Sequence, residues 1–194
     1  TYPRHVGMKQ EHDGKKVLIL GGGYAGVNAA LRLRVRDKAV HITLVNERGE
    51  FVERIRNHQK AAGATLKRLD LRQVLGNGIA FVQGGAENID TAMKQVLVKT
   101  ATGIFPFAYD ILVYAPGSGA PAARTMNAFR VNTADAAAQL KDALRHEPRR
   151  GLTIVGAGLT GIELATELRE AWPERKITVY DRHTLGHGFS EKAR

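Results

Sequence analysis

The chain has 194 residues, of which 43% are hydrophobic and 25% charged, an ordinary globular composition with enough length for one large domain or two small ones. It contains no cysteine, which excludes structural disulfides, thiolate metal sites and a redox-active cysteine pair. The formal net charge is +10, but the basic residues are scattered and aromatic residues are not interleaved with them, which disfavours nucleic-acid binding.

The chain opens with a polar stretch and then shows a strand-turn-helix-strand pattern. We expect Thr1–Lys16 to be a flexible tail. The short apolar run Val17–Leu20 predicts a buried parallel strand that leads into a glycine-rich turn. A helix over Ala25–Val35 and a second strand over His41–Val45 complete the order that a Rossmann unit requires.

The middle of the chain predicts shorter elements. Helices are expected at Phe51–Ala62 and Asp70–Leu75. Strands are expected at Ile79–Gln83, Val96–Thr100 and Tyr109–Ala115. The segment Pro116–Asn132 is rich in Gly, Ser, Pro and small residues, so we interpret it as the crossing between two domains.

The opening pattern then recurs. Thr133 is expected to cap a helix that runs to about His146 and stops before Pro148. The later elements are a strand at Leu152–Val155, a glycine-rich turn at Gly156–Gly161, a helix at Ile162–Ala171 and a strand at Ile177–Tyr180. The two turns begin 135 positions apart, at residues 21 and 156.

These elements predict an α/β, Rossmann-like FAD/NAD(P)-binding fold, with a parallel sheet and helices on both faces. The expected organisation is a tail at 1–16, a first domain at 17–125 and the start of a second at 126–194. A lone βαβ unit leaves an open sheet edge, and its helices have too little surface to pack on. The second Rossmann unit is therefore expected to be incomplete, its C-terminal remainder absent.

Both turns fit the G-x-G-x-x-G pattern. The first glycine makes the sharp turn, the second lets the backbone approach a pyrophosphate, and the third lets helix and strand pack closely. The helix N-terminus then presents N–H groups and a positive dipole end to the anion. Two such turns indicate two dinucleotide sites; the alternative is a pair of purely structural turns. The glycines, in order, are Gly21, Gly23 and Gly26, then Gly156, Gly158 and Gly161.

The end of each second strand is where this fingerprint places an acid that binds the ribose hydroxyls. Asp181 occupies that place in the later unit and favours NAD(H) over NADP(H). Arg182 beside it softens that preference, because an arginine there can hold a 2′-phosphate. In the earlier unit the strand ends at Asn46 and Glu47, and either could take the ribose role.

From Lys16 to about Asp181 the chain resembles the N-terminal half of the FAD/NAD(P)H-dependent pyridine nucleotide-disulfide oxidoreductase superfamily. Its type II NADH dehydrogenase and apoptosis-inducing-factor-like branch is the most similar part. The segments that carry the resemblance are GGGYAG at Gly21–Gly26, GGAENID at Gly84–Asp90, YDILVYAPGS at Tyr109–Ser118 and GAGLTGIELA at Gly156–Ala165.

The resemblance implies two cofactors, FAD and NAD(P)H, with NADH favoured, and assigns residues to each. The FAD-binding residues implied are Gly21, Gly23, Tyr24, Ala25, Gly26, Asn46, Glu47, Arg54, Ala86, Ala115, Pro116 and Gly117. Those implied for NAD(P)H are Gly156, Gly158, Leu159, Thr160, Gly161 and Asp181. Glu163 stands where the family places a catalytic glutamate near nicotinamide and flavin. No metal site is expected.

Three positions depart from the family pattern. Pro116 replaces the usual threonine, Asn46 stands near the usual acid, and the cysteine pair that disulfide reductases carry after the first Rossmann unit is missing. In that neighbourhood Arg54 either faces the flavin or lies on a solvated helix face. His58 is an acid-base candidate, but we interpret it as a helix-surface histidine.

The resemblance implies transfer of hydride from NADH to FAD, and of electrons onward to a small-molecule acceptor such as a quinone, not a disulfide. The alternatives are a flavin monooxygenase and a non-catalytic nucleotide- or DNA-binding module. A homodimer is left open. The expected location is the cytoplasm; peripheral contact with the inner face of a membrane is the alternative, and only through the missing C-terminal part.

Overall fold

A computed structural model describes residues 14–118, 127–184 and 190 of the chain. The chain divides into two compact units. Unit 1 takes Thr1–Phe51 and Arg68–Gly119, and unit 2 takes Val52–Lys67 and Ala120–Arg194. Each unit is therefore built from two separate stretches of sequence.

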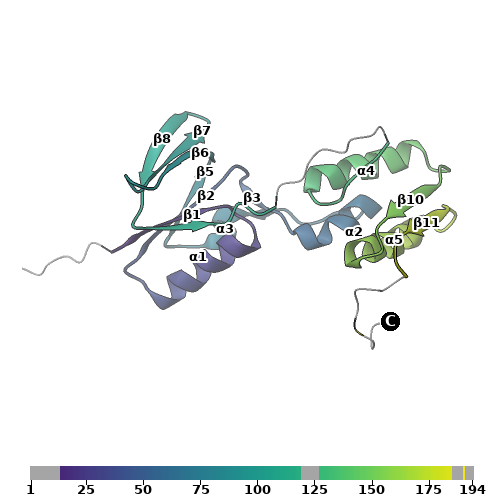
Figure 1. Cartoon of the computed structure of the whole chain (residues 1–194), viewed down its shortest axis with the longest axis horizontal. Helices are drawn as coiled ribbons and strands as arrows, with labels where there is room; N and C mark the ends of the chain where they lie inside the picture. Colours follow the sequence, from purple (N-terminus) through teal and green to yellow (C-terminus); the bar gives the residue numbers. More distant parts are fainter. Residues whose placement is uncertain (1–13, 119–126, 185–189, 191–194) are drawn as a thin grey trace, which may run out of the picture. The chain divides into compact units, whose positions relative to one another are not determined.

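A parallel four-stranded sheet forms the centre of unit 1 (Figure 1). Its strand order is β5-β2-β1-β9, the arrangement of a Rossmann-like α/β fold. The strands are β1 (Lys16–Leu20), β2 (His41–Asn46), β5 (Ile79–Gln83) and β9 (Ile111–Tyr114). The apolar run predicted for β1 is buried from Val17 to Leu20, as a strand covered on both faces requires.

Alternate residues of β1 face two different layers, because successive side chains in a strand point to opposite sides. Val17 and Ile19 belong to the cluster that packs on α1 (Tyr24–Arg36) and α3 (Leu71–Leu75). Leu18 and Leu20 belong to the cluster on the other face. Burying one such Leu or Ile side chain stabilises the fold by roughly 1.5–3 kcal/mol.

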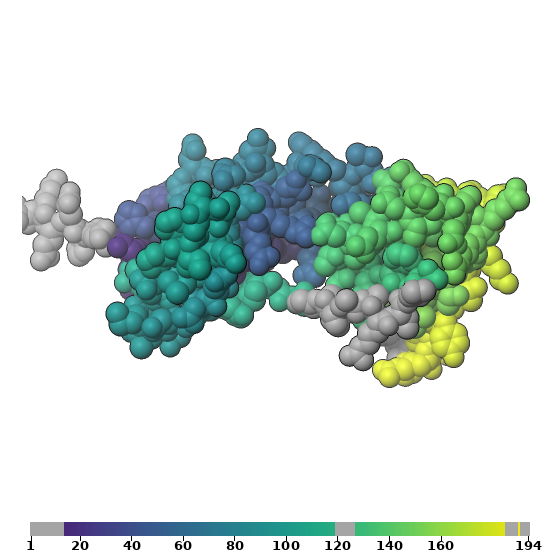
Figure 2. Space-filling view, turned by 90° about the horizontal axis from the view of Figure 1, so that it is seen from above, coloured from purple at the N-terminus to yellow at the C-terminus, as the bar shows by residue number. Residues whose placement is uncertain are grey.

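The layer on that other face is an antiparallel sheet of three strands (Figure 1). The strands are β6 (Gly85–Asp90), β7 (Gln95–Thr100) and β8 (Gly103–Ala108). In its middle strand, Val96 and Val98 are fully buried against the parallel sheet. Figure 2 shows this sheet in teal at the surface of unit 1, where β8 is largely exposed.

Only the middle strand of this sheet was predicted from the sequence, and the two outer strands were missed. In β6 the pairing shifts between Ala86 and Asn88, so the strand lacks regular alternation. In β8 Pro106 interrupts the strand pattern, which an outer strand tolerates.

Unit 2 is built around a pair of parallel strands with helices beside them. The strands are β10 (Leu152–Val155) and β11 (Ile177–Tyr180). The helices are α2 (Asn57–Ala62), α4 (Ala134–His146) and α5 (Leu159–Ala171). The small residues Ala61 and Ala137 are fully buried with Leu168 in the cluster that joins the three helices.

Thr133 caps α4 as predicted, because its side chain accepts a hydrogen bond from the Ala136 N–H at 3.1 Å. Helix α4 ends at His146, before Pro148. These two bounds agree with the sequence-based prediction.

The prediction of one helix over Phe51–Ala62 was wrong at its start. Phe51 belongs to β3 (Glu50–Phe51), which pairs antiparallel with β4 (Leu69–Asp70). A 3₁₀ turn, η1 (Arg54–Arg56), follows, and only α2 is α-helical. Its end at Gly63 is explained by that residue's φ of 118°, a left-handed conformation that favours glycine.

The segment Val52–Lys67 packs in unit 2, whereas the predicted domains, 17–125 and 126–194, were contiguous. The reason is physical: α2 offers small apolar residues, Ala61 and Ala62, whose buried partners come from α4 and α5 much later in the chain. No local pattern in the sequence contains that information.

Candidate functional site

The first glycine-rich turn joins β1 to α1, and two of its glycines are required by backbone geometry. Gly21 has a φ of 110°, and a Cβ on it would lie 2.0 Å from the Ala115 carbonyl oxygen. A Cβ on Gly26 would lie 1.9 Å from the Gly21 carbonyl oxygen. By contrast, a Cβ on Gly23 would meet nothing within 4 Å. Gly23 is therefore not required for packing, and the space beside its Cα is open.

The second turn, between β10 and α5, repeats this geometry. Gly156 has a φ of 107°, and a Cβ on Gly161 would lie 1.9 Å from the Gly156 carbonyl oxygen. A Cβ on Gly158 would again meet nothing within 4 Å. Leu159 and Thr160 open the helix and are exposed, as Tyr24 and Ala25 are in the first turn.

The side chain that ends the second strand holds each turn in place. Asn46 Oδ1 accepts a hydrogen bond from the Gly22 N–H at 2.8 Å. Asp181 Oδ2 accepts one from the Ala157 N–H at 2.6 Å. Asn46 and Asp181 are separated by the same 135 positions as the turns, so Asn46, not Glu47, is the structural equivalent of Asp181.

The Asp181 carboxylate accepts two backbone hydrogen bonds, and they lower its pKa below the usual 3.8. The larger cause is the bond from the Ala157 N–H; the second is the bond from the His183 N–H, at 2.8 Å. A carboxyl with a lowered pKa stabilises the fold above its unfolded value of 3.8, and that contribution is lost as the pH falls through the lower folded value.

Acidification is therefore expected to loosen the second turn and leave the first unchanged, because the Asn46 amide does not titrate. The ¹H–¹⁵N NMR signals of Ala157 and Gly22 can be followed from about pH 5 to about pH 2. We expect the Ala157 signal to move with protonation of Asp181 while the Gly22 signal stays in place. Equal movement of both signals would contradict the assigned hydrogen bonds.

An open pocket of about 610 Å³ lies in unit 1 beside the first turn. Ligand pockets of this size, roughly 300–1,000 Å³, hold small molecules and cofactors. Five of the predicted site residues line it: Gly21, Asn46, Glu47, Ala86 and Pro116. The structure thus brings together four segments that are far apart in the sequence.

Other predicted residues lie near this pocket, and some of the lining residues were missed. The Ala115 carbonyl contacts the Gly21 backbone, and Gly117 has a φ of 76° just beyond Pro116. Leu20, Arg48, Asn88 and Tyr114 also line the pocket and were not predicted individually. Arg48 could have been found, because it directly follows the strand-end residues Asn46 and Glu47.

Arg54 lies in unit 2, in the 3₁₀ turn, where its Nε donates to the Asn132 carbonyl oxygen at 3.1 Å. It therefore packs within the unit that carries the second turn. Its contact with a flavin stays a prediction.

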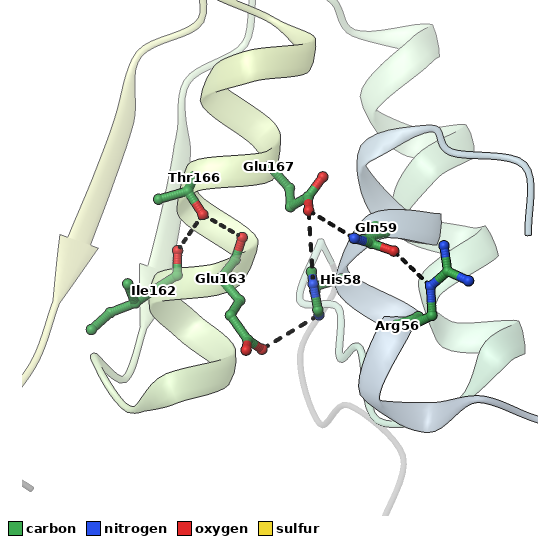
Figure 3. A network of polar contacts seen from close by, with 7 residues as sticks. All are labelled: Arg56, His58, Gln59, Ile162, Glu163, Thr166 and Glu167. Atoms are coloured by element: carbon green, nitrogen blue, oxygen red, sulfur yellow. Dashed lines mark hydrogen bonds and ion pairs between the residues drawn. The ribbon is translucent and has the colours of Figure 1, made fainter. Parts of the chain in front are cut away.

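Glu163 lies on α5, one turn after Gly158, and its carboxylate faces α2 (Figure 3). Its Oε2 is 3.5 Å from His58 Nδ1. The interpretation of His58 as a surface histidine was wrong, since its side chain is only 12% exposed. The pairing was missed because the two residues are 105 positions apart.

Within the described part of the chain, no group of three or more His, Asp or Glu side chains is arranged so that it could hold a metal ion, and every helix is too short or too polar to cross a lipid bilayer.

Comparison with known proteins gives a consistent result. The family model described as pyridine nucleotide-disulphide oxidoreductase matches residues 15–194. A type II NADH:quinone oxidoreductase of Staphylococcus haemolyticus is 33% identical over 185 residues, which cover 84% of this chain and 45% of that protein. An NADH dehydrogenase-like protein of Mycobacterium tuberculosis is 34% identical over 172 residues, which cover 79% and 42%.

Two solved structures share the fold. The sulfide:quinone oxidoreductase of Aquifex aeolicus has a TM-score of 0.74 at 24% identity, covering 90% of this chain and 45% of that one. NDH2 of Plasmodium falciparum in complex with NADH has a TM-score of 0.72 at 19% identity, covering 92% and 44%. The chain spans less than half the length of each of these relatives.

Proposed function

Because this chain belongs to the pyridine nucleotide-disulphide oxidoreductase family, we propose that it binds FAD in unit 1 and NADH in unit 2. The observation that carries the proposal is the repeated turn. Each turn has two glycines that the backbone requires, by a positive φ or by close packing, and a middle one, Gly23 or Gly158, that has an ordinary negative φ and no atom within 4 Å of where a Cβ would be. A purely structural turn gives no reason for a glycine to recur at this middle position.

In unit 1 the diphosphate of FAD would lie against Gly23 and the N–H groups that open α1, where a helix N-terminus favours an anion. Asn46 and Glu47 line the pocket that lies beside this turn and are the proposed ribose contacts. The backbone of Ala86 would meet the adenine, and residues Ala115 to Gly117 would close the site. Asn46 already uses Oδ1 for Gly22 and Nδ2 for the Arg48 carbonyl, so Glu47 has the freer oxygen atoms.

In unit 2 the diphosphate of NADH would lie against Gly158, with Leu159 and Thr160 supplying N–H groups from the start of α5. Asp181 keeps acceptor capacity for the ribose hydroxyls, because a carboxylate has about four lone-pair sites and two are used by Ala157 and His183. Glu163 is the proposed catalytic residue at the nicotinamide end.

When bound, the two cofactors supply the redox chemistry, with hydride passing from the nicotinamide to the flavin and electrons from there to a second acceptor. The residues of this chain hold the nucleotides in place and lower the entropic cost of the encounter. The chain contains no cysteine, so its own residues supply no dithiol. A quinone is the proposed acceptor, as the name of the staphylococcal relative states for that protein.

The proposal is tested on the complete gene product by recording its visible spectrum under anaerobic conditions before and after NADH is added. A flavin band that bleaches with NADH, and returns when a quinone is added, supports it. A protein that binds no flavin, and binds DNA with an affinity that falls steeply with salt, would instead support the non-catalytic alternative. Reoxidation that requires oxygen and an organic substrate would support a monooxygenase.

Replacing Asp181 with alanine is expected to weaken NADH use more than NADPH use. The loss of hydrogen bonds to a charged group is expected to lower kcat/KM for NADH by about tenfold to hundredfold. The kcat/KM for NADPH is expected to fall less, because removing the carboxylate also removes its repulsion of the 2′-phosphate.

The matched variant is Asp181→Asn, which copies Asn46 of the first unit. It is expected to keep the hydrogen bond to Ala157 while removing the charge, so it separates the ribose contact from the turn's stability. Equal losses for both dinucleotides in Asp181→Ala would count against a ribose role.

A further inference from the structure

Three charged side chains from two helices meet at one point in unit 2 (Figure 3). His58 of α2 points between Glu163 and Glu167, which lie four residues apart on one face of α5. The distance from His58 Nδ1 to Glu163 Oε2 is 3.5 Å, and that from Nε2 to Glu167 Oε1 is 3.9 Å. Each ring nitrogen thus faces a carboxylate.

This arrangement fits a protonated imidazole. A neutral imidazole donates from one nitrogen only, whereas an imidazolium donates from both. Two carboxylates four residues apart on a helix repel each other, and a cation between them removes that repulsion. Histidine is also the side chain whose charge ordinarily changes between pH 5 and pH 8.

The two ends of this cluster differ in how firmly they are held. Glu167 Oε1 also accepts a hydrogen bond from Gln59 Nε2 at 3.1 Å, and Gln59 Oε1 in turn accepts one from Arg56 Nε at 2.8 Å. Arg56 is also paired with Glu53 at 3.5 Å. Glu163 has His58 as its side-chain partner and is 40% exposed, against 31% for Glu167.

Other charges near His58 come from the same elements. Helix α2 carries Lys60, the 3₁₀ turn carries Arg54 and Arg56, and α5 carries the two glutamates. Helix α4 meets α2 through apolar residues, including Ala137 and Leu140. Glu163 and Glu167 are therefore the charged groups that pair with His58.

We propose that His58 is a positioning residue for Glu163: when protonated, it holds the Glu163 carboxylate toward α2, and when neutral it releases it. This inference rests on the proposed function, in which Glu163 lies at the nicotinamide end of the NADH site. It makes NADH use depend on the charge of the His58 side chain.

The first test needs no cofactor. The ring Cε1–H signals of His58 and His146 are followed by NMR over a pH titration of the chain. In Glu163→Gln and in Glu167→Gln the His58 signal is expected to titrate at lower pH than in the wild type, since a negative neighbour is lost. His146, on α4, should not change. Glu174→Gln, at an exposed position beyond the end of α5, is the matched control and should leave the His58 signal unchanged.

The second test measures the rate constant of flavin reduction at saturating NADH in the complete gene product at pH 6 and pH 8. The wild-type rate is expected to differ between the two on the order of fivefold, the size of one partly exposed ion pair. In His58→Gln, which keeps one neutral donor, that ratio should fall to about one, and Glu163→Gln should remove it as well. Glu174→Gln should retain it.

The outcomes distinguish the two proposals. A His58 signal that does not respond to Glu163→Gln overturns the positioning role and leaves the proposed function standing. The same conclusion follows if the ratio of the flavin-reduction rate constants at pH 6 and pH 8 is unchanged in His58→Gln. A wild-type protein that holds flavin but is not reduced by NADH overturns the proposed function, and the positioning role with it.

Discussion

Replacing Gly23 with valine is expected to abolish FAD binding and leave the fold of unit 1 intact. Gly23 has φ and ψ of −82° and −172°, extended angles that valine adopts readily, and a Cβ there meets no protein atom within 4 Å. The valine side chain would occupy the space proposed for the diphosphate. We expect the affinity for FAD to fall by at least about a hundredfold, because close backbone approach is what this glycine provides.

The measurement is the flavin content of the purified protein together with its thermal unfolding temperature. The second turn offers a matched control: Gly158→Val should impair NADH binding and leave the flavin content normal. A Gly23→Val protein with a full complement of flavin would refute the site in unit 1. A large drop in unfolding temperature would instead show that Gly23 is needed for packing.

Replacing Gly26 with valine should have the opposite effect and unfold unit 1. Its Cβ would lie 1.9 Å from the Gly21 carbonyl oxygen and 3.3 Å from Ile19 Cγ2, far inside van der Waals contact. Helix α1 would have to move away from β1, separating buried Val27 and Ala30 from the core. We expect a loss of more than about 4 kcal/mol, in the range reached only when backbone or core packing is broken.

Urea unfolding followed by circular dichroism measures this loss. Ala25→Val, one position earlier and on the exposed side of the helix, is the control and should cost only the difference in helix propensity, about 0.5 kcal/mol. Gly161→Val should repeat the effect in unit 2, where the same contact with Gly156 is also 1.9 Å. If Gly26→Val unfolded at the same urea concentration as Ala25→Val, the close packing of α1 on β1 would be disproved.

The parts of the fold that could be predicted from the sequence are those that local chemistry determines. Apolar runs such as Leu152–Val155 and Ile79–Gln83 became strands with the predicted bounds. Thr133 marked the start of α4 because a threonine side chain can accept a hydrogen bond from a backbone N–H of the first turn, which has no acceptor within the helix. The family resemblance was confirmed over residues 15–194.

The parts that could not be predicted depend on contacts across long stretches of sequence. Strand β6 is irregular and polar, and it exists because β7 pairs with it. His58 gave no sign of its two carboxylate partners, which come from a helix about a hundred positions later. The structural equivalence of Asn46 and Asp181, however, could have been found from the sequence, because the 135-residue repeat aligns them; which of Asn46 and Glu47 binds the ribose stays a prediction.

The division of each unit into two stretches of sequence has a consequence for biosynthesis. Residues 52–67 leave the ribosome long before α4 and α5, their only helical partners in unit 2 among the described residues. A six-residue helix is unstable in water by itself, so α2 must remain an unstructured loop on the nascent chain while unit 1 is completed around it. A chain that ended between about residues 119 and 134 would contain all of unit 1 but neither α4 nor α5, and we expect residues 52–67 to remain unfolded in it and to be cut by proteases.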